Sequence, residues 1–355
     1  MKRKLALLLA LIMAFLLIAG CDGGSKPEPS GSEPAGSEDP VDTTEPPDVD
    51  TSPTNINLCI ASEPETLDPN MVSSVDGATY TQHTFEGLMK YVATGETVGA
   101  DGEMKDTAID FGQAASYEAT KNDAGQPVYT FKLRDNIFWS DGEPVKAGDF
   151  EYSWKRIVDP ALAADYGYIL DGIVLNAAKI QAEEADPSEL GIVAKDDKTL
   201  EITLEAECPY FVELCAFSAL MPLRKDVIDK HGAAWTDPGN MVGNGAFVLT
   251  EWVHDSYIKM APNEKYYDAA NASDITLTWW LSDSATAMLS AYESGVYDFF
   301  DSPPLDRIED LQASGDAFIA PYVGTYYTYL NTERIKDWRV RAALALSVDR
   351  DYLVE

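Results

Sequence analysis

The sequence predicts a mixed α/β protein with more than one folded domain. Residues 55–355 are rich in aromatic and periodic segments and are long enough for two domains. Within them, period-two alternation typical of strands and apolar stripes typical of helices follow one another along the chain. The first 54 residues show neither pattern, and their composition indicates a different role.

The amino-terminal segment, residues 1–21, has the pattern of a lipoprotein signal peptide. Lys2, Arg3 and Lys4 precede an unbroken apolar run at residues 5–18, which is short for a membrane span and typical of an export signal. The run ends in residues 18–21 (IAGC), which resemble a bacterial lipobox with Cys21 as the lipid attachment site. The alternative is a plain secretory signal followed by a chance cysteine. We therefore predict a protein that is lipid-anchored at the extracytoplasmic face of the bacterial plasma membrane, with the anchor as its only membrane contact.

Residues 22–54 form an acidic segment rich in proline, serine and glycine, with seven prolines, nine acids and no aromatic residue. Such a segment buries too little apolar surface to offset its ordering entropy, so we expect a disordered tether. As a flexible coil it would reach about 30 Å. The whole chain has a net charge of −34, which excludes nucleic acid as a favoured partner and is compatible with cationic or neutral solutes.

Several elements are predicted from local patterns. Residues 128–133 alternate as a strand, residues 140–144 (SDGEP) have turn chemistry, and residues 147–158 carry an apolar helical face. Residues 247–260 alternate on both sides of the turn 254–256, which predicts a hairpin. Residues 284–294 form a helix with Ala285, Met288, Leu289 and Tyr292 facing inward, and Gly295 ends it.

The stretch 133–156 raises the possibility of a sugar-cleaving enzyme, because carboxylates surround Trp139 and Trp154. Its acids have structural explanations, however. Asp141 belongs to the turn, and Asp149 and Glu151 lie in the first turn of a helix, where carboxylates are favoured. We interpret both tryptophans as core residues and predict no catalytic residue and no enzyme activity.

The remaining motifs predict no metal site and no cofactor. The three histidines have no second ligand at helical or hairpin spacing. Residues 243–245 (GNG) begin like a dinucleotide loop, but a strand-like segment follows them where a helix is required. Cys59 is interpreted as a core residue. Cys208 and Cys215 are either two buried free thiols or, as export permits, a disulfide bridge.

A series of short motifs in a fixed order is similar to extracellular solute-binding proteins of family 5, the oligopeptide- and dipeptide-binding proteins of ABC transporters. The motifs are residues 62–69 (SEPETLDP), 85–88 (FEGL), 129–134 (YTFKLR), 139–142 (WSDG), 149–154 (DFEYSW), 196–204 (DDKTLEITL), 209–211 (PYF), 244–247 (NGAF), 294–298 (SGVYD), 340–344 (VRAAL) and 349–350 (DR). They extend from about residue 56 to the last residue, so the resemblance rests on their order as well as on each motif.

The resemblance implies a two-lobed clamp of the periplasmic-binding-protein type (class II) with an extra inserted domain. Residues 55–86 and 225–323 would form a discontinuous lobe I, residues 87–224 the inserted domain, and residues 324–355 the start of lobe II. We expect the second lobe to be mostly missing from this chain, so that the sequence is a carboxy-terminally truncated fragment. The apolar stripe of Trp338, Val340, Leu344 and Val348 would then be uncovered, and the chain alone would aggregate and fail to bind peptide.

In this family an extended oligopeptide ligand pairs its backbone with the cleft, and closure of the lobes traps it for delivery to the permease and ATPase subunits of the transporter. Ser73, Ser74 and Val75 match the family's peptide-pairing strand, and Tyr166 matches a tyrosine of the cleft. Tyr322, Gly324 and Tyr329 lie in the segment that would cross between the lobes and form another wall. The alternative for the tyrosines is ordinary packing on strand faces.

Other functions on the same fold stay open at this point, because a fold does not fix its ligand. One is a receptor that reports a peptide signal without importing it. Another is a binding protein for a nickel chelate or an oligosaccharide. An extracellular hydrolase is a more distant third, since the sequence offers no activated nucleophile.

Overall fold

The computed structural model describes residues 54–61, 63–98, 104–272, 274–317, 319, 327–350 and 352–353. Cys21, the signal segment and nearly all of the tether lie outside the described residues, as do Tyr322 and Gly324. Within the described part, no helix combines the length and the apolar character needed to cross a membrane.

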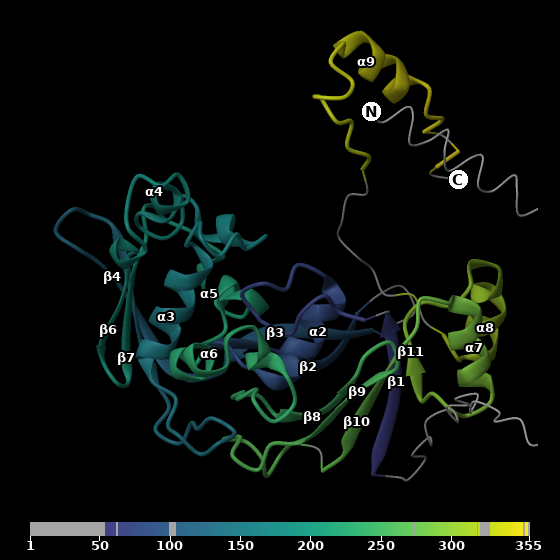
Figure 1. Cartoon of the computed structure of the whole chain (residues 1–355), viewed down its shortest axis with the longest axis horizontal. Coiled ribbons are helices and arrows are strands. Elements are labelled where there is room, and N and C mark those ends of the chain that lie inside the picture. The colour runs from purple at the N-terminus through teal and green to yellow at the C-terminus, as the bar shows by residue number, and fades with distance from the viewer. Residues whose placement is uncertain are drawn as a thin grey trace, which may run out of the picture. The chain divides into compact units, whose positions relative to one another are not determined.

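The described residues form three sheets, and the first combines strands from distant parts of the chain (Figure 1). Its strand order is β11-β1-β10-β9-β8, and β1 pairs in parallel with both β10 and β11, whereas β8, β9 and β10 pair antiparallel. The bounds are β1 Asn55–Ala61, β8 Phe247–Val253, β9 Tyr257–Pro262, β10 Thr276–Leu281 and β11 Phe299–Phe300.

The other two sheets are antiparallel and come from one continuous region. One is four-stranded in the order β4-β5-β7-β6, and the other is the long pair β2–β3. The bounds are β2 Met89–Val98, β3 Met104–Phe111, β4 Ala114–Lys121, β5 Pro127–Leu133, β6 Ile192–Asp196 and β7 Thr199–Thr203.

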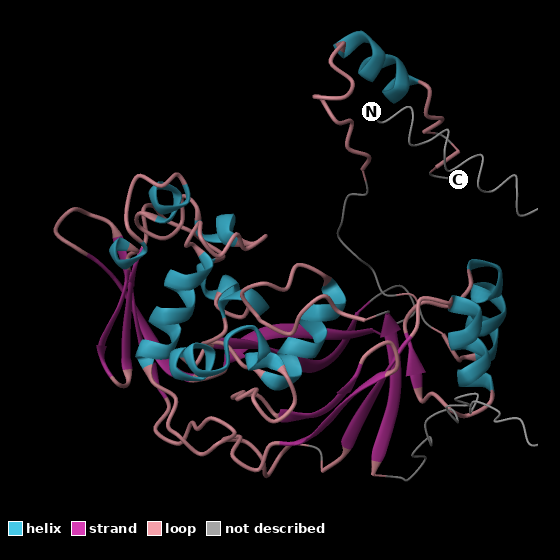
Figure 2. Ribbon diagram, in the orientation of Figure 1, coloured by secondary structure: helices cyan, strands magenta, loops and turns pink. Residues whose placement is uncertain are grey.

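Most of the described helices lie between these strands in the sequence, and several pack against them. Figure 2 shows α3 along the four-stranded sheet, where it contacts β6 and β7. The α-helices are α2 Val75–Thr84, α3 Ala147–Ile157, α4 Ala177–Gln181, α5 Phe211–Leu214, α6 Lys225–His231, α7 Ala285–Glu293, α8 Ile308–Ser314 and α9 Trp338–Leu346. The 3₁₀ turns are η1 Gly167–Leu170, η2 Pro187–Glu189, η3 Ser218–Leu220, η4 Gly232–Thr236 and η5 Leu305–Arg307.

Two apolar cores stabilise these elements. The larger lies between α3 and the four-stranded sheet and contains Trp139, Phe150 and Trp154, all fully buried. The smaller lies against the first sheet and includes Tyr80 of α2 with Trp279 of β10, whose rings meet edge to face at 5.3 Å between centroids. Burial of aromatic rings of this size is a large apolar contribution to folding.

The locally predicted elements are confirmed. Residues 128–133 lie in β5, and the hairpin is β8–β9, with Leu249 opposite Met260. Ser284 caps α7 by accepting from the Ala287 N–H, and Gly295 ends that helix at a φ of +75°. Residues 147–157 form α3, and Trp139 and Trp154 are core residues.

Asp149 and Glu151, two acids of the stretch 133–156, have structural partners. Asp149 accepts from the Lys146 N–H at 2.9 Å and from Trp139 Nε1 at 3.1 Å. Glu151 pairs with Lys155 and accepts from the Ala194 N–H at 2.9 Å. Burial raises the pKa of Asp149, against the effect of its hydrogen-bond donors. Its carboxylate therefore ties the turn to the start of α3.

Cys59 is buried in β1, as predicted for a core residue. Cys208 and Cys215 are both buried and free, so the structure contains the two thiols and not the alternative bridge. Among the described residues, no group of three or more His, Cys, Asp or Glu side chains is arranged to hold a metal ion.

Candidate ligand-binding site

The segment expected to pair with a peptide begins a helix. Val75 is the first residue of α2, and Ser74, with φ −97° and ψ 155°, is its N-cap. The Ser74 Oγ accepts from the Gly77 N–H at 3.0 Å, which satisfies one of the free N–H groups of the first turn. The prediction of a strand at 73–75 is therefore wrong at Val75, because the Ser74 hydroxyl caps a helix that begins there.

The position of this segment is nevertheless open to a ligand. Ser73 and Ser74 are exposed, and the Val75 side chain is 77% exposed. In the described part of the chain, no hydrogen bond occupies the backbone of Ser73 or the Val75 N–H. The N–H of a first-turn residue has no partner within its own helix, so it is a free donor at the positive end of α2.

A buried ion pair holds the loop that precedes this segment. Arg156 of α3 binds Asp68 through two bonds, from Nη2 to Oδ2 at 2.6 Å and from Nη1 to Oδ1 at 3.0 Å. Trp235 Nε1 also donates to Asp68, at 3.3 Å. The Asp68 backbone carbonyl accepts from the N–H groups of Met71 and Val72, which turns the chain toward Ser73. The loop is thus fixed from α3, an element of the larger core.

Tyr166 lies immediately before η1 and is half-buried. Its ring meets Phe217 edge to face, with centroids 5.1 Å apart and an angle of 86°, and it also contacts Tyr168, which is 61% exposed. Phe217 directly precedes η3, and η3 contacts α2. Phe217 and α2 both adjoin η3, so this 3₁₀ turn connects the aromatic pair to the helix that Val75 begins.

Tyr329 is not joined to these candidates. It is 81% exposed, and its hydroxyl is hydrogen-bonded to that of Tyr327 at 2.7 Å. In the part of the chain that the structure describes, no hydrogen bond, ion pair or ring contact links Tyr329 to Ser73, Ser74, Val75 or Tyr166.

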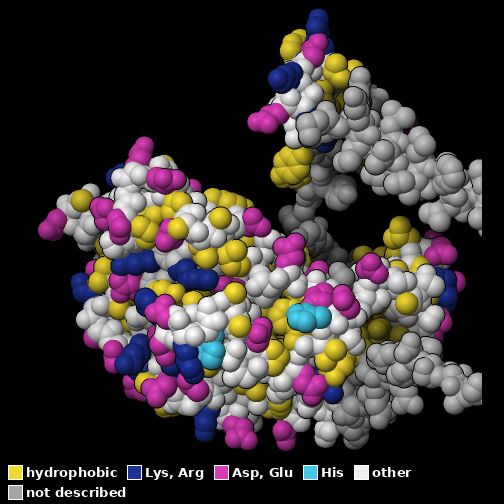
Figure 3. Space-filling model, viewed as in Figure 1, with side chains coloured by type: hydrophobic (Ala, Val, Ile, Leu, Met, Phe, Trp, Pro, Cys, Tyr) yellow, Lys and Arg dark blue, Asp and Glu magenta, His cyan; other side chains and the backbone are white. Residues whose placement is uncertain are grey.

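An acidic cavity lies beside Ser73 and Ser74. It has a volume of about 280 Å³ and is lined by Glu63, Pro64, Glu65, Thr66, Met71, Val72, Ser73, Ser74 and Asp76. On the face shown in Figure 3, acidic side chains are scattered among apolar ones, and Lys and Arg gather in a few groups. The local surroundings of the candidate segment therefore share the negative charge of the whole chain.

Glu63, in the wall of this cavity, is bound by the β8–β9 turn. His254 Nδ1 contacts Glu63 Oε1, and the Asp255 N–H donates to Oε2 at 2.8 Å. Burial alone would raise the pKa of Glu63, but these two contacts lower it, and the carboxylate in turn raises the pKa of His254. Sequence reasoning missed this pair, because the two residues are far apart in the chain and show no shared spacing.

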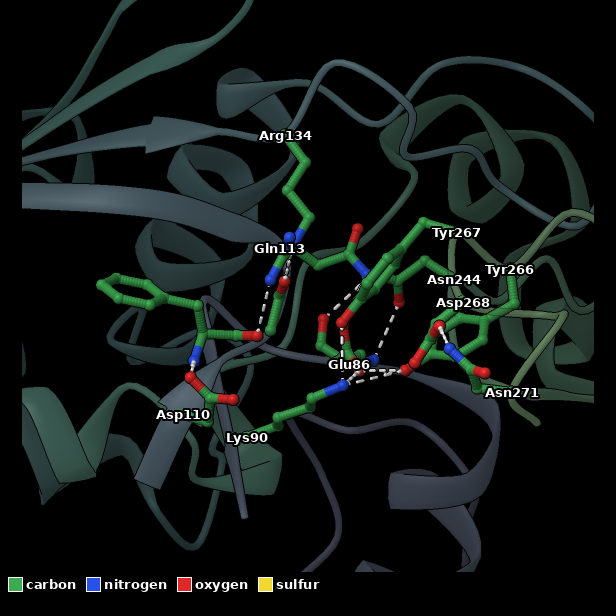
Figure 4. A network of polar contacts seen from close by, with 12 residues as sticks. Glu86, Lys90, Asp110, Gln113, Arg134, Asn244, Tyr266, Tyr267, Asp268 and Asn271 are labelled. Carbon is green, nitrogen blue, oxygen red and sulfur yellow. Dashed lines mark hydrogen bonds and ion pairs between the residues drawn. The ribbon is translucent and has the colours of Figure 1, made fainter. Parts of the chain in front are cut away.

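A second polar network, shown in Figure 4, joins the motifs at 85–88 and 244–247. The Asn244 side chain accepts from the Glu86 N–H at 3.0 Å and donates to the Glu86 carbonyl at 2.9 Å. The Glu86 carboxylate accepts from Gln113 Nε2 and from the Tyr266 hydroxyl, with Lys90 Nζ at 3.7 Å. Burial raises the pKa of Glu86 despite these partners. The network connects the first sheet to the start of β2.

The glycines on either side of Asn244 permit this contact. A Cβ on Gly243 would lie 2.1 Å from the Thr84 carbonyl oxygen, and one on Gly245 would lie 2.6 Å from the Phe85 nitrogen. Both neighbours are backbone atoms that cannot rotate away. Glycine is therefore required on both sides of Asn244, because two backbone segments meet there. This packing explains the GNG motif, and no nucleotide is needed to account for it.

Comparisons with known proteins agree with the fold. The sequence model for bacterial extracellular solute-binding proteins, family 5, matches residues 113–355. The periplasmic oligopeptide-binding protein OppA of Salmonella typhimurium is 33% identical over 82% of this chain and 52% of its own. The periplasmic murein peptide-binding protein MppA of Escherichia coli is 35% identical over 83% and 53%. The probable deoxycholate-binding periplasmic protein YgiS of the same species is 37% identical over 83% and 53%. The chain spans about half the length of these curated relatives.

Solved structures give the same result. OppA of Burkholderia pseudomallei superposes with a TM-score of 0.75 at 34% identity, covering 84% of this chain and 57% of its own. The E. coli murein tripeptide-binding protein MppA superposes with a TM-score of 0.74 at 34% identity, covering 84% and 56%. The predicted α/β fold of the periplasmic-binding-protein type is thereby confirmed. The chain belongs to family 5 of the bacterial extracellular solute-binding proteins.

Proposed function

We propose that this protein captures oligopeptides in an extended conformation and delivers them to the permease and ATPase subunits of an ABC importer. In this proposal, a lipid on Cys21 holds the protein at the extracytoplasmic face of the plasma membrane, and residues 22–54 are its tether. The division into lobe I at 55–86 and 225–323, an inserted domain at 87–224 and a further lobe from 324 belongs to the same proposal. The separate origins of the first sheet and the four-stranded sheet support that division.

The observation that carries the proposal is the unoccupied backbone of Ser73 and the unoccupied N–H of Val75, which begins a helix in contact with η3, the turn that the Tyr166–Phe217 pair adjoins. The family's relatives include oligopeptide- and murein peptide-binding proteins. An extended peptide presents alternating N–H and C=O groups that such a free segment can pair. The aromatic pair offers a flat apolar wall for a ligand side chain. Ser73, Ser74, Val75 and Tyr166 are therefore proposed ligand contacts, and Tyr322, Gly324 and Tyr329 are proposed contacts of the crossing segment.

The relative named for deoxycholate suggests a second class of ligand, an anionic amphiphile. The charges near the candidate segment argue against it here. Glu63, Glu65 and Asp76 line the adjacent cavity, and the chain has a net charge of −34. A carboxylate ligand would meet a repulsive potential at that wall, whereas the free ammonium of a peptide would not.

Isothermal titration calorimetry tests the proposal on the intact protein, by which we mean this chain together with the second lobe that the family resemblance implies. The titrants are a library of tripeptides and tetrapeptides, a mixture of oligosaccharides, a nickel chelate and deoxycholate. We expect saturable heat with the peptides alone. Saturable heat with one of the other titrants, and none with the peptides, would assign the site to that ligand and refute the proposed function.

A further inference from the structure

We infer that Asn70 is a positioning residue that holds the two walls of the candidate site, the Ser73–Val75 segment and the Tyr166–Phe217 pair, in one fixed relation. This inference rests on the proposed function, because it assigns those two walls to the ligand. Among the described residues, the Asn70 side chain makes no hydrogen bond to either wall. It acts through the main chain next to each wall: Asn70 itself lies three residues before Ser73, and its partner Ala219 lies two residues after Phe217.

The Asn70 side chain is completely buried, and its polar atoms are bonded to three residues that lie on two segments, α3 and η3. Its Oδ1 accepts from Arg156 Nη1 at 2.9 Å. Its Nδ2 donates to Ser153 Oγ at 3.1 Å and to the Ala219 carbonyl at 2.8 Å. One amide therefore links the loop before Ser73 to both α3 and η3.

The Ala219 bond is one of three that fix consecutive carbonyls of the η3 region. The Leu220 carbonyl accepts from Trp154 Nε1 at 2.8 Å, and the Met221 carbonyl accepts from Ser153 Oγ at 2.6 Å. All three donors are buried side chains, so this backbone cannot shift without breaking bonds that water does not replace. Phe217, one residue before η3, is placed by the same bonds.

The chemistry of the site requires an asparagine. The Arg156 guanidinium is a donor only, so it orients the Asn70 amide with its oxygen toward α3 and its NH₂ toward Ala219. An aspartate would set a carboxylate oxygen against the Ala219 carbonyl. An alanine would leave the Ala219 carbonyl without this donor and remove one acceptor from Arg156. Only a side chain with one acceptor and two donors completes the three contacts.

The test compares Asn70→Ala with Asn263→Ala, a matched control. Asn263 is 4% exposed, donates from Nδ2 to the Gly245 carbonyl at 2.8 Å and accepts from the Lys265 N–H at 3.0 Å. Asn263 is nearly as buried as Asn70 and makes two side-chain hydrogen bonds where Asn70 makes three, but it lies directly after β9. Ser153→Ala is a milder variant, which removes one contact of Asn70 and one carbonyl bond of the η3 region.

Two quantities are measured on each intact variant: backbone amide exchange by mass spectrometry, and affinity for a defined tetrapeptide that binds the parent. For Asn70→Ala we expect faster exchange in residues 71–78 and 217–221, and a loss of affinity of roughly tenfold or more. Asn263→Ala should leave both unchanged at the site. Ser153→Ala should change the exchange rate and the affinity in the same direction as Asn70→Ala, but by less. If Asn70→Ala does not fold, the Ser153→Ala result tests the inference in its place.

An Asn70→Ala protein with parental exchange at 71–78, or with an affinity within about twofold of the parent, would overturn the inference. The same conclusion would follow if Asn263→Ala lost as much affinity. A parent that binds no peptide would refute the proposed function instead. In that case the exchange data alone decide whether Asn70 orders both walls.

Discussion

The buried Arg156–Asp68 ion pair allows a quantitative prediction of the free energy of unfolding. The side chains are 15% and 7% exposed, and Arg156 makes three bonds to Asp68 and Asn70. Arg156→Met keeps the length and apolar stem of the side chain but leaves the Asp68 carboxylate buried without its counter-ion. Removal of one partner from a buried pair costs about 3–5 kcal/mol. Because Trp235 and the Asn70 N–H still donate to Asp68, we expect about 3 kcal/mol.

The adjacent residue is the control. Lys155 also pairs with an acid, Glu151, one turn away, but these side chains are 22% and 26% exposed. A pair at this spacing that still reaches solvent contributes about 0.5 kcal/mol, so Lys155→Met should cost much less than Arg156→Met. Urea unfolding followed by tryptophan fluorescence measures both variants, since Trp139, Trp154 and Trp235 lie in the same core.

A double-mutant cycle makes the test specific. Asp68→Asn combined with Arg156→Met leaves no buried charge, so the double variant should be more stable than the sum of the single changes predicts, by at least about 1 kcal/mol. If Arg156→Met is within about 1 kcal/mol of Lys155→Met, or if the two changes are additive, then this pair does not anchor the loop and the reasoning is refuted.

Three further predictions concern other parts of the chain. Cys21→Ser should leave the protein uncleaved or released from the membrane; a cleaved variant that stays membrane-bound after a carbonate wash would contradict the lipid anchor. Gly243→Ala should lower the free energy of unfolding by about 1–3 kcal/mol, because the added Cβ forces two backbone segments apart. Gly148→Ala, where a Cβ meets no atom within 4 Å, should be neutral or stabilising. Equal urea midpoints for the two variants would contradict the close contact at Gly243. NMR titration should give His254 a pKa above its usual value, and Glu63→Gln should return that pKa to the usual value. The stabilisation that this imidazole contributes is complete below about pH 6.5 and is lost as the pH rises through the raised pKa. A His254 titration without a shift would refute the contact with Glu63.

Local patterns predicted the elements whose formation depends on near neighbours. The β8–β9 hairpin follows from period-two alternation, and α7 follows from apolar residues three and four positions apart with Gly295 after them. The burial of Trp139 and Trp154 follows from their places in a strand–turn–helix pattern. In each case the deciding interaction lies within a few residues, where periodicity is informative.

The candidate site depends on contacts that no local pattern contains. Asn244 meets the Glu86 backbone across 158 positions, and Arg156 meets Asp68 across 88. The resemblance to relatives assigned Ser73 to the candidate site, but it did not predict the helical conformation of Val75, which begins the helix that Ser74 caps. A serine is compatible with an extended strand and with the N-cap of a helix. The residues that follow it determine which of the two structures forms.

The comparison of backbone with side-chain recognition tests the central proposal most directly. Calorimetry on the intact protein would compare the tightest tetrapeptide of the library with a scrambled version and with one methylated at its backbone amides. Capture by backbone pairing predicts that scrambling changes the affinity by about tenfold or less, near 1.4 kcal/mol, and that methylation costs more. The reverse order, with scrambling more damaging than methylation, would contradict the proposal and indicate a receptor that reads one peptide sequence.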